Sequence, residues 1–372
     1  MHFDITLSLL ETCASSLLEP FPALEHLRLK SHGTIRTIVI PANFLGNSAP
    51  GLRVVHLNGC AFPAFSRLLS VSKNIVSLRL ENVAGEGFSK PEDLALGLST
   101  ATQLKYLNID FQSDIVVPYP PRPSLHTRFV LPALIEFQYA GNCVYLEDLA
   151  SRIDAPNIVQ IGATFSSSVA CDTYELCEFF GRGEELRSSS HDRTTRIRFF
   201  EGSVIFAHNF FRSSSHPGSF LLRIAGPNWL DDLVSLISHI CLELQSSGAI
   251  QKVMWLDIEG PPEPSRWYRE MDPANWLTLL GALTGVKWLR VVGMLVPSVV
   301  SALAHWQVTG RSTLDILQAL QDLHLEGGPR MYTWASASVE PFITVRKLYG
   351  RPVSVHYEGL ESGMAIDRSI EN

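Results

Sequence analysis

The residue types that usually perform catalysis form no complete site in this sequence. The glycine pairs at 85–87 and 181–183 lack the third glycine of a dinucleotide-binding loop, and no Gly-Lys-Ser/Thr follows a run of glycines. The serine within residues 46–50 misses the nucleophile elbow, because Pro50 stands where that motif needs a second glycine. The twelve histidines are dispersed, and neither H-E-x-x-H nor a paired-cysteine metal motif occurs. The sequence therefore predicts a protein that is not an enzyme and uses no cofactor and no metal.

Tryptophans are well suited to anchor a protein partner, and all seven lie in the second half of the chain. Trp276 and Trp306 follow helical spacing, which predicts that they belong to the core. Trp255 and Trp288 each occupy the third position of an L-x-x-L-x-L segment. Period-two alternation points that position away from the buried fourth and sixth residues. We therefore predict that Trp255 and Trp288 are apolar anchors for a protein partner.

Basic and polar residues recur at the same outward positions in the first half of the chain. Strands stacked about 4.8 Å apart would align Arg28, His56 and Arg79 into a row across one open, concave sheet face. Like charges this close repel each other, which favours an acidic protein segment as the partner. A solvated face with no partner is the alternative interpretation. The predicted binding residues are Arg28, His56, Arg79, Tyr106 and Asn108, and the same face carries His26, Glu136 and Gln138.

Cys60 and Asn142 occupy the position of a leucine-rich repeat that is usually Asn or Cys. A reactive thiol or a ligand contact is one interpretation of these residues. The sequence favours the structural one, in which this position points inward and bonds the backbone of neighbouring loops.

The elements that must position these residues follow a leucine-rich repeat. The segment 52–62, LRVVHLNGCAF, matches the template L-x-x-L-x-L-x-x-N/C-x-L at every fixed position. Further L-x-x-L-x-L matches begin at residues 24, 75, 104, 134 and 158, so the array is irregular. Proline stands two residues ahead of several matches, where its missing N–H costs no ladder bond. These prolines are Pro22, Pro50, Pro132 and Pro156.

Helical patterns alternate with these strands, which predicts a parallel sheet with helices on its outer side. Helices are expected over 63–74, after the capping box that starts at Ser89, over 145–153 and from Asp172. A proline-rich loop is expected at 118–123. The expected fold class is an α/β leucine-rich-repeat solenoid, a horseshoe with the sheet on its concave face.

The pattern divides the chain into four parts. Residues 1–184 form a first repeat block, and 185–227 form an irregular, strand-rich segment with strands on either side of Glu201-Gly202. Residues 228–357 form a second block. Its expected helices are one over 228–246 and another that begins at Asp272-Pro273. Its expected strands are VMWLDIEG, VKWLRVVG and LQDLHLEG. Residues 358–372 are expected to be a polar tail.

Composition bounds the class of partner and the compartment. The chain has 372 residues and a formal net charge of −7, which argues against nucleic acid or a membrane surface as the partner. The six cysteines are scattered, which favours a reducing compartment. The N-terminus does not read as a signal peptide, so the cytoplasm or nucleus is the expected compartment. The chain is also expected to be a monomer.

Several longer phrases carry a resemblance to a known family. They include FPALEHLRL, IPANFLGNSAPGLRVVHLNG, KPEDLALGLSTATQLKYLNIDF, LEDLASRIDAPNI and RPVSVHYEG. The chain resembles the F-box-like/leucine-rich-repeat proteins of mushroom-forming fungi. The resemblance implies an F-box module that docks on a ubiquitin-ligase adaptor, followed by a repeat region that receives a target. No three-helix module is expected upstream of Leu24, so only the repeat region is matched.

Two functions follow from this pattern. The first is a non-enzymatic, protein-binding leucine-rich-repeat scaffold whose concave sheet face holds the partner. The alternative is a substrate receptor of an SCF-type ubiquitin ligase whose F-box is missing from this chain, which would add a ligase adaptor as a partner.

Overall fold

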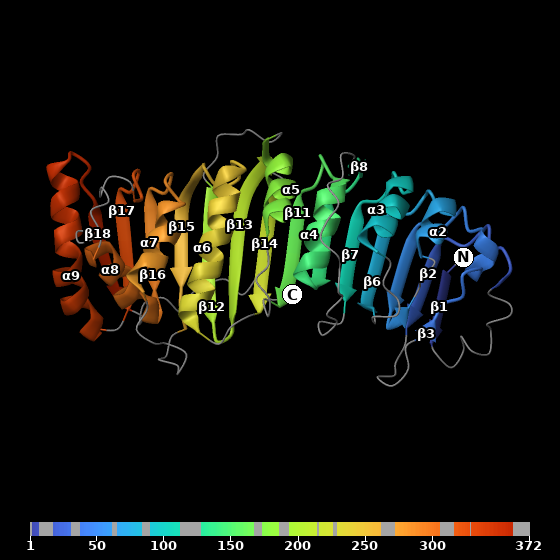
Figure 1. The fold of residues 1–372 in the computed structure, drawn as a ribbon, viewed down its shortest axis with the longest axis horizontal. Coiled ribbons are helices and arrows are strands. Elements are labelled where there is room, and N and C mark those ends of the chain that lie inside the picture. The colour runs from blue at the N-terminus through green and yellow to red at the C-terminus, as the bar shows by residue number, and fades with distance from the viewer. Residues whose placement is uncertain are drawn as a thin grey trace. The chain divides into compact units, whose positions relative to one another are not determined.

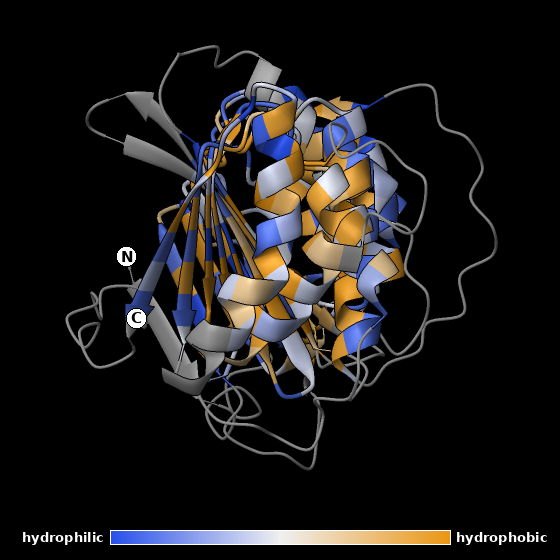
Figure 2. Cartoon of the chain, turned by 90° about the vertical axis from the view of Figure 1, so that its left-hand side faces the viewer, coloured by the Kyte–Doolittle hydropathy of each residue, from blue (hydrophilic) through white to orange (hydrophobic). Residues whose placement is uncertain are grey.

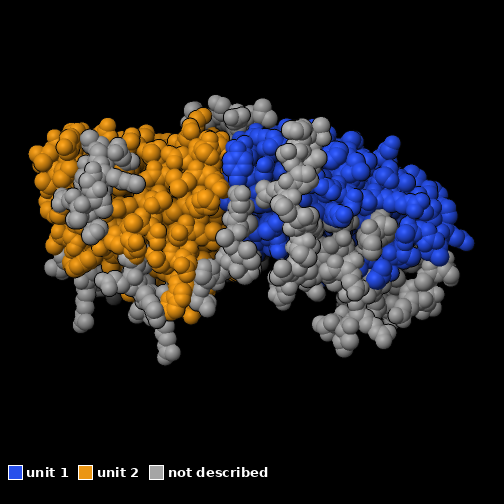
Figure 3. Space-filling view, viewed as in Figure 1, with its two compact units in different colours: residues 1–188 blue, residues 189–372 orange. Residues whose placement is uncertain are grey.

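The computed structural model describes residues 2–6, 18–30, 38–61, 65–83, 90–111, 128–166, 173–185, 193–213, 216–225, 229–261, 272–305, 316–327 and 329–359. The chain divides into two compact units, unit 1 at Met1–Ser188 and unit 2 at Ser189–Asn372 (Figure 3). Each unit combines sheet strands with helices around an apolar core. No helix in the described part of the chain is long and apolar enough to cross a membrane.

The main strands of unit 1 are all parallel to their neighbours (Figure 1). They follow one another in chain order: β1 (His2–Thr6), β2 (His26–Lys30), β4 (Val54–Asn58), β6 (Ser77–Val83), β7 (Tyr106–Phe111), β9 (Glu136–Gly141) and β11 (Gln160–Ser166). A parallel pair needs a crossover between its strands, and here helices supply several of these crossovers.

The helices of unit 1 pack against their neighbours in chain order, α2 on α3, α3 on α4 and α4 on α5. They are α2 (Phe65–Val71), α3 (Pro91–Thr100), α4 (Cys143–Arg152) and α5 (Tyr174–Glu185), with a short 3-10 turn, η2, at Phe44–Asn47. Two short parallel ladders complete the unit, β3 (Ile38–Val39) with β5 (Cys60–Ala61) and β8 (Phe129–Val130) with β10 (Ile153–Asp154).

A hydrogen-bonded turn leads into most of the parallel strands. The N–H of Leu52 donates to the carbonyl of Ala49 at 3.1 Å, and the same bond closes the turn before most of the other parallel strands. The donors there are Leu24, Ile75, Leu104, Leu134, Ile158, Val253, Val286 and Leu320. The four prolines singled out in the sequence stand second in such turns, where their fixed φ suits a β-turn. Asn157 Nδ2 then ties two turns together by donating to the carbonyl of Pro132 at 2.8 Å.

Unit 2 begins with an antiparallel meander and continues with parallel strands. The meander is β12 (Arg193–Phe200), β13 (Ser203–Ser213) and β14 (His216–Ala225), and the parallel strands are β15 (Val253–Glu259), β16 (Trp288–Val292), β17 (Asp322–Gly327) and β18 (Ser354–Gly359). In space β14, β13, β12, β15, β16, β17 and β18 are successive neighbours. Residues 201–202 form the turn between β12 and β13, as the sequence predicted.

The helices of unit 2 also pack in chain order, α6 on α7, α7 on α8 and α8 on α9. They are α6 (Leu230–Ser246), α7 (Pro273–Gly281), α8 (Val296–His305) and α9 (Pro329–Leu348), with a 3-10 turn, η4, at Gly293–Leu295. Asp272 caps α7, because its carboxylate accepts from the N–H of Ala274 at 2.9 Å, and Trp276 on this helix is fully buried. Both features were predicted.

The core forms because alternate strand residues face the helices. β2 and β4 each alternate half-buried and buried side chains along their length. The fourth and sixth template residues Leu27, Leu29, Val55 and Leu57 are at most 1% exposed. Burying each such side chain stabilises the fold by roughly 1.5–3 kcal/mol.

The structure confirms a mixed α/β protein with mostly parallel strands and alternating helices, and it corrects several details. The sheet strands are not all parallel, because the meander of unit 2 is antiparallel. Lys90, and not the predicted Ser89, is the N-cap of α3. β1 and α9 were not predicted. The expected loop at 118–123 and Trp306 lie outside the described residues.

Candidate functional site

One face of the strands in each unit is left open by the helices. Figure 2 shows the helices on one side of the strands. The residues that alternate with the core positions are half-buried or exposed, as in β2, β4 and β16. A sheet that is covered on one face presents such residues to solvent or to a partner. The open face of each unit is therefore its candidate binding surface.

The basic row predicted for unit 1 is aligned. Arg28 on β2 lies opposite His56 on β4, and His56 lies opposite Arg79 on β6. Asn108 and Gln138 continue the row on β7 and β9. Arg79 is exposed, whereas Arg28 and His56 are half-buried. We call these five residues the basic row.

The other predicted residues of this face lie one row away. His26, Val54, Ser77, Tyr106 and Glu136 are opposite one another on successive strands. Tyr106 is 45% exposed, so its ring is accessible to a partner. The predicted set in unit 1 thus occupies two adjacent rows, one from the third and one from the fifth template positions.

A carboxylate on the same face contacts the centre of the basic row. Nε2 of His56 lies 2.8 Å from Oε2 of Glu81, and Asn58 Nδ2 donates to the same oxygen at 3.0 Å. Burial raises the pKa of Glu81, but His56, Asn58 and Arg79 lower it, and the result lies below the ordinary value. Burial and then the charge of Glu81 raise the pKa of Asp110. Glu81 thus gives His56 an acidic partner within the sheet, which the sequence did not predict.

The two predicted tryptophan anchors of unit 2 stack on each other. Trp255 on β15 lies directly opposite Trp288 on β16, with ring centroids 4.6 Å apart and planes 15° from parallel. Lys287 Nζ lies 6.0 Å from the centroid of the Trp288 ring, within cation–π range. Trp255 is 40% exposed. We call Trp255 and Trp288 the tryptophan pair.

Small and polar residues flank the tryptophan pair along its row. Thr194 on β12 lies opposite Trp255, and Asp322 on β17 lies opposite Trp288. Thr194 and Asp322 are only half-buried. The pair is thus an apolar feature bounded by polar residues, the arrangement of an interface anchor with its rim.

The row beside the tryptophan pair is charged and largely satisfied within the sheet. Arg196 on β12 contacts Asp257 at 3.3 Å and Glu259 at 3.4 Å, and Arg198 contacts Glu259 at 2.6 Å. Burial raises the pKa of Asp257, although Arg196 and Arg290 partly oppose this. Because the charges are already paired, they offer a partner less than the tryptophan pair does.

Two histidines continue this row on the last strands. His324 on β17 and His356 on β18 are paired in register, with ring centroids 4.4 Å apart and planes 16° from parallel. His356 Nε2 lies 3.4 Å from Asp322 Oδ1. Sequence reasoning missed both histidines. His324 occupies the fifth position of its L-x-x-L-x-L segment, which also points outward. The alternation rule that identified the tryptophans would therefore have identified His324 too.

The structural interpretation of Cys60 and Asn142 is confirmed. Cys60 is buried, and burial raises the pKa of its thiol to about 11, although its Sγ donates to the carbonyl of Asn58 at 3.5 Å. The thiolate that makes a cysteine reactive is therefore disfavoured. Asn142 caps α4, accepting from Val144 N at 2.8 Å and Tyr145 N at 3.2 Å.

Neither a metal cluster nor an activated nucleophile emerges from the side chains that the structure describes. Those residues contain no group of three His, Cys, Asp or Glu side chains placed to hold a metal ion. Cys177 and Cys241 are buried thiols that form no disulfide, and burial raises the pKa of Cys241. Cys143 is disulfide-bonded.

Comparison with known proteins assigns no family to the chain. No protein-family model matches its sequence, and no curated protein matches it significantly.

Proposed function

We propose that this chain is a leucine-rich-repeat solenoid and a non-enzymatic scaffold that binds a protein partner on its open strand face. The repeated turn, strand and helix, with buried template residues, support the solenoid. Repeat scaffolds of this kind use the open face of their strands for binding.

The tryptophan pair carries the proposal. Large apolar side chains are costly to leave in water, and Trp255 keeps 40% of its surface exposed. Tryptophan is enriched among the few residues that dominate protein–protein binding energy. Stacking of the two rings also fixes their orientation, so less conformational entropy is lost when a partner covers them.

The partner in this proposal covers the tryptophan pair with apolar groups and leaves the neighbouring charged row paired within the sheet. The basic row of unit 1 is a weaker candidate for the binding surface, because His56 already contacts the Glu81 carboxylate. Arg79 in this row and Tyr106 in the adjacent row are exposed, so a partner could contact them.

Affinity capture from the native organism, followed by mass spectrometry, tests the proposal. The bait carries Trp255→Ser and Trp288→Ser together, and the control bait carries Trp334→Ser. Trp334 is 44% exposed on α9, so the control removes a comparably exposed tryptophan from outside the strand face.

The wild-type and Trp334→Ser baits should capture a common partner that the double variant loses. A hot-spot tryptophan contributes roughly 2 kcal/mol or more, so the partner's Kd should rise at least about 30-fold. Equal capture by all three baits, with unchanged thermal stability, would place the binding surface elsewhere.

A further inference from the structure

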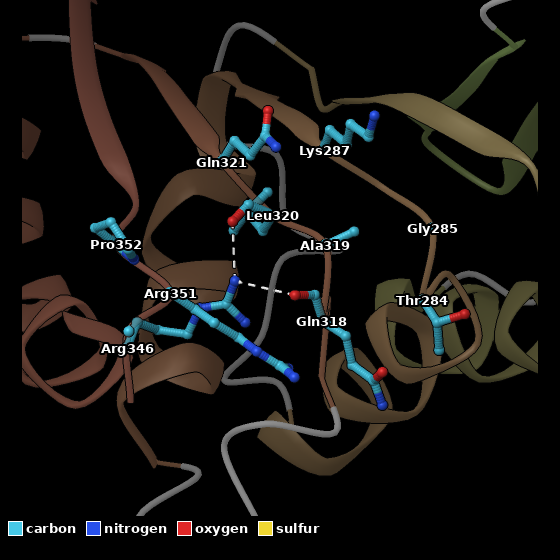
Figure 4. Close-up of a pocket in the computed structure, with 11 residues that line it drawn as sticks. Thr284, Gly285, Lys287, Gln318, Ala319, Leu320, Gln321, Arg346, Arg351 and Pro352 are labelled. Carbon is cyan, nitrogen blue, oxygen red and sulfur yellow. Dashed lines mark hydrogen bonds between the residues drawn. The ribbon is translucent and has the colours of Figure 1, made fainter. Parts of the chain in front are cut away.

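A pocket of about 650 Å³ lies in unit 2 where β16, β17 and β18 begin (Figure 4). Lys287 and Gln321 line it from the residues just before β16 and β17, and Arg351 lines it from the segment before β18. The backbone fixes these positions, because Gln321 N donates to the carbonyl of Lys287 and Ser354 N to that of Gln321, both at 2.8 Å. The same ladder that holds the strands together thus holds the pocket's side chains near one another.

A buried arginine forms part of the pocket. Arg346 on α9 is 0% exposed, and its guanidinium donates to the carbonyls of Leu317 at 3.1 Å and Leu320 at 2.9 Å. Figure 4 shows Arg346 bonded to the loop that carries Gln318 and Leu320, with the Arg351 side chain beside it. Carbonyl groups orient this cation but do not neutralise it. Its Nε has no hydrogen-bond partner among the described residues.

The charged residues among the described lining of the pocket are all cationic. Three of its lining residues, Lys287, Arg346 and Arg351, are cationic, and none of the described lining residues carries a carboxylate. This occurs in a chain with a formal net charge of −7. Burial and then the charge of Arg351 lower the pKa of Arg346, so the two guanidinium groups repel each other. An anion in the pocket would relieve that repulsion.

We propose that this pocket binds a phosphomonoester group. Arginine and lysine are the side chains that recognise phosphate oxygens, and a dianion matches three cations better than a single carboxylate does. Gln318, Gln321 and Thr284 add amide and hydroxyl donors around the cations. The volume lies within the range of small-molecule sites, so the phosphate is one part of a larger ligand. That ligand is a phosphorylated small molecule or a phosphorylated side chain of a partner.

Lys287 connects the pocket to the tryptophan pair. Its ammonium lies 6.0 Å from the Trp288 ring centroid and also lines the pocket. Movement of this ammonium toward a phosphate changes the electrostatic environment of the indole, which gives a fluorescence signal. The phosphate site does not depend on the proposed protein-binding function, because it is tested on the purified chain alone.

Titration of the purified chain with inorganic phosphate at low ionic strength tests the pocket, by calorimetry and by tryptophan fluorescence. The test variant is Lys287→Gln with Arg351→Gln, which keeps the buried Arg346 in place. The control is Arg67→Gln with Lys73→Gln, two exposed cations of unit 1 whose loss changes the net charge equally. The Trp288→Phe variant tests whether the fluorescence change comes from the Trp288 indole.

Wild type and control should bind phosphate with the same affinity, and the test variant should bind at least tenfold more weakly. Trp288→Phe should retain the heat of binding and lose the fluorescence change. Absence of binding to wild type, or equal binding by the test variant, would overturn the proposal. Titrations with a sugar phosphate and with a phosphoserine peptide then distinguish a small-molecule ligand from a phosphorylated partner. The ligand class that the pocket recognises should bind more tightly than inorganic phosphate. If neither does, the phosphomonoester assignment is wrong.

Discussion

At the scale of single residues, the open face of unit 1 is controlled by a pair that the sequence did not reveal. The alternation rule correctly placed His56 and Arg79 on the open face and opposite each other. It could not show that Glu81, two residues along β6 from Arg79, would turn toward His56. The pairing of His56 and Glu81 depends on side-chain geometry across two strands, which periodicity does not encode.

The pKa of Glu81 tests this pairing directly. His56→Gln removes a hydrogen-bonding ring and its positive charge, so the Glu81 pKa should rise toward or above its ordinary value of 4.5. Carboxyl NMR titration measures it. His324→Gln, on the open face of unit 2, is the matched control and should leave the Glu81 pKa unchanged. An unchanged value in His56→Gln would show that the pair does not form in solution.

The same pair has a consequence for stability. The folded-state pKa of Glu81 lies below the unfolded value, so the unfolded chain binds this proton more readily. The contribution of Glu81 to stability is therefore complete above about pH 4.5, and it disappears as the pH falls through the lower folded pKa. The difference in unfolding free energy between wild type and Glu81→Gln should shrink in that range.

At the scale of elements, local sequence signals predicted a helix end or a turn correctly where the signalling residue bonds to backbone groups within that same element. Asp272 caps α7 as its type and spacing indicated. Contacts from distant residues were invisible: Glu147 on α4 is buried and accepts from the N–H groups of Glu175 and Leu176 at the start of α5. Nothing in the spacing of residues 147 and 175 signals that contact.

Other elements were missed because their local signals conflict with their structure. α9 contains Pro341, a residue that usually ends a helix, and packing against α8 outweighs that preference. The antiparallel pairing of β13 with β14 was missed, since strand patterns alone do not give the direction of pairing.

The two N-caps provide a matched prediction of opposite sign. Asp272→Ala removes the cap of α7 and should destabilise the protein by roughly 1 kcal/mol. Lys90 at the start of α3 has φ −60° and ψ 150°, the extended backbone of an N-cap, yet makes no side-chain cap bond. Lys90→Asp should therefore stabilise the protein by a similar amount. Urea denaturation measures both, and the same sign for both variants would contradict the capping assignments.

At the scale of the whole molecule, the sequence correctly predicted strand and helix alternation because both come from hydrophobic periodicity. It could not predict which exposed residues interact, since the tryptophan pair, the paired histidines and the cationic pocket form only when strands align in register. The candidate sites therefore depend on strand register, which hydrophobic periodicity alone does not give.

The proposed solenoid makes a prediction about size. In a solenoid each repeat contacts only its neighbours, so the molecule lengthens with every repeat. A compact domain of 372 residues would have a radius of gyration of roughly 21 Å. Small-angle scattering of the purified monomer should give a clearly larger radius, and circular dichroism should show helix and strand together. A radius near the compact value would rule out the solenoid and leave only a mixed α/β fold.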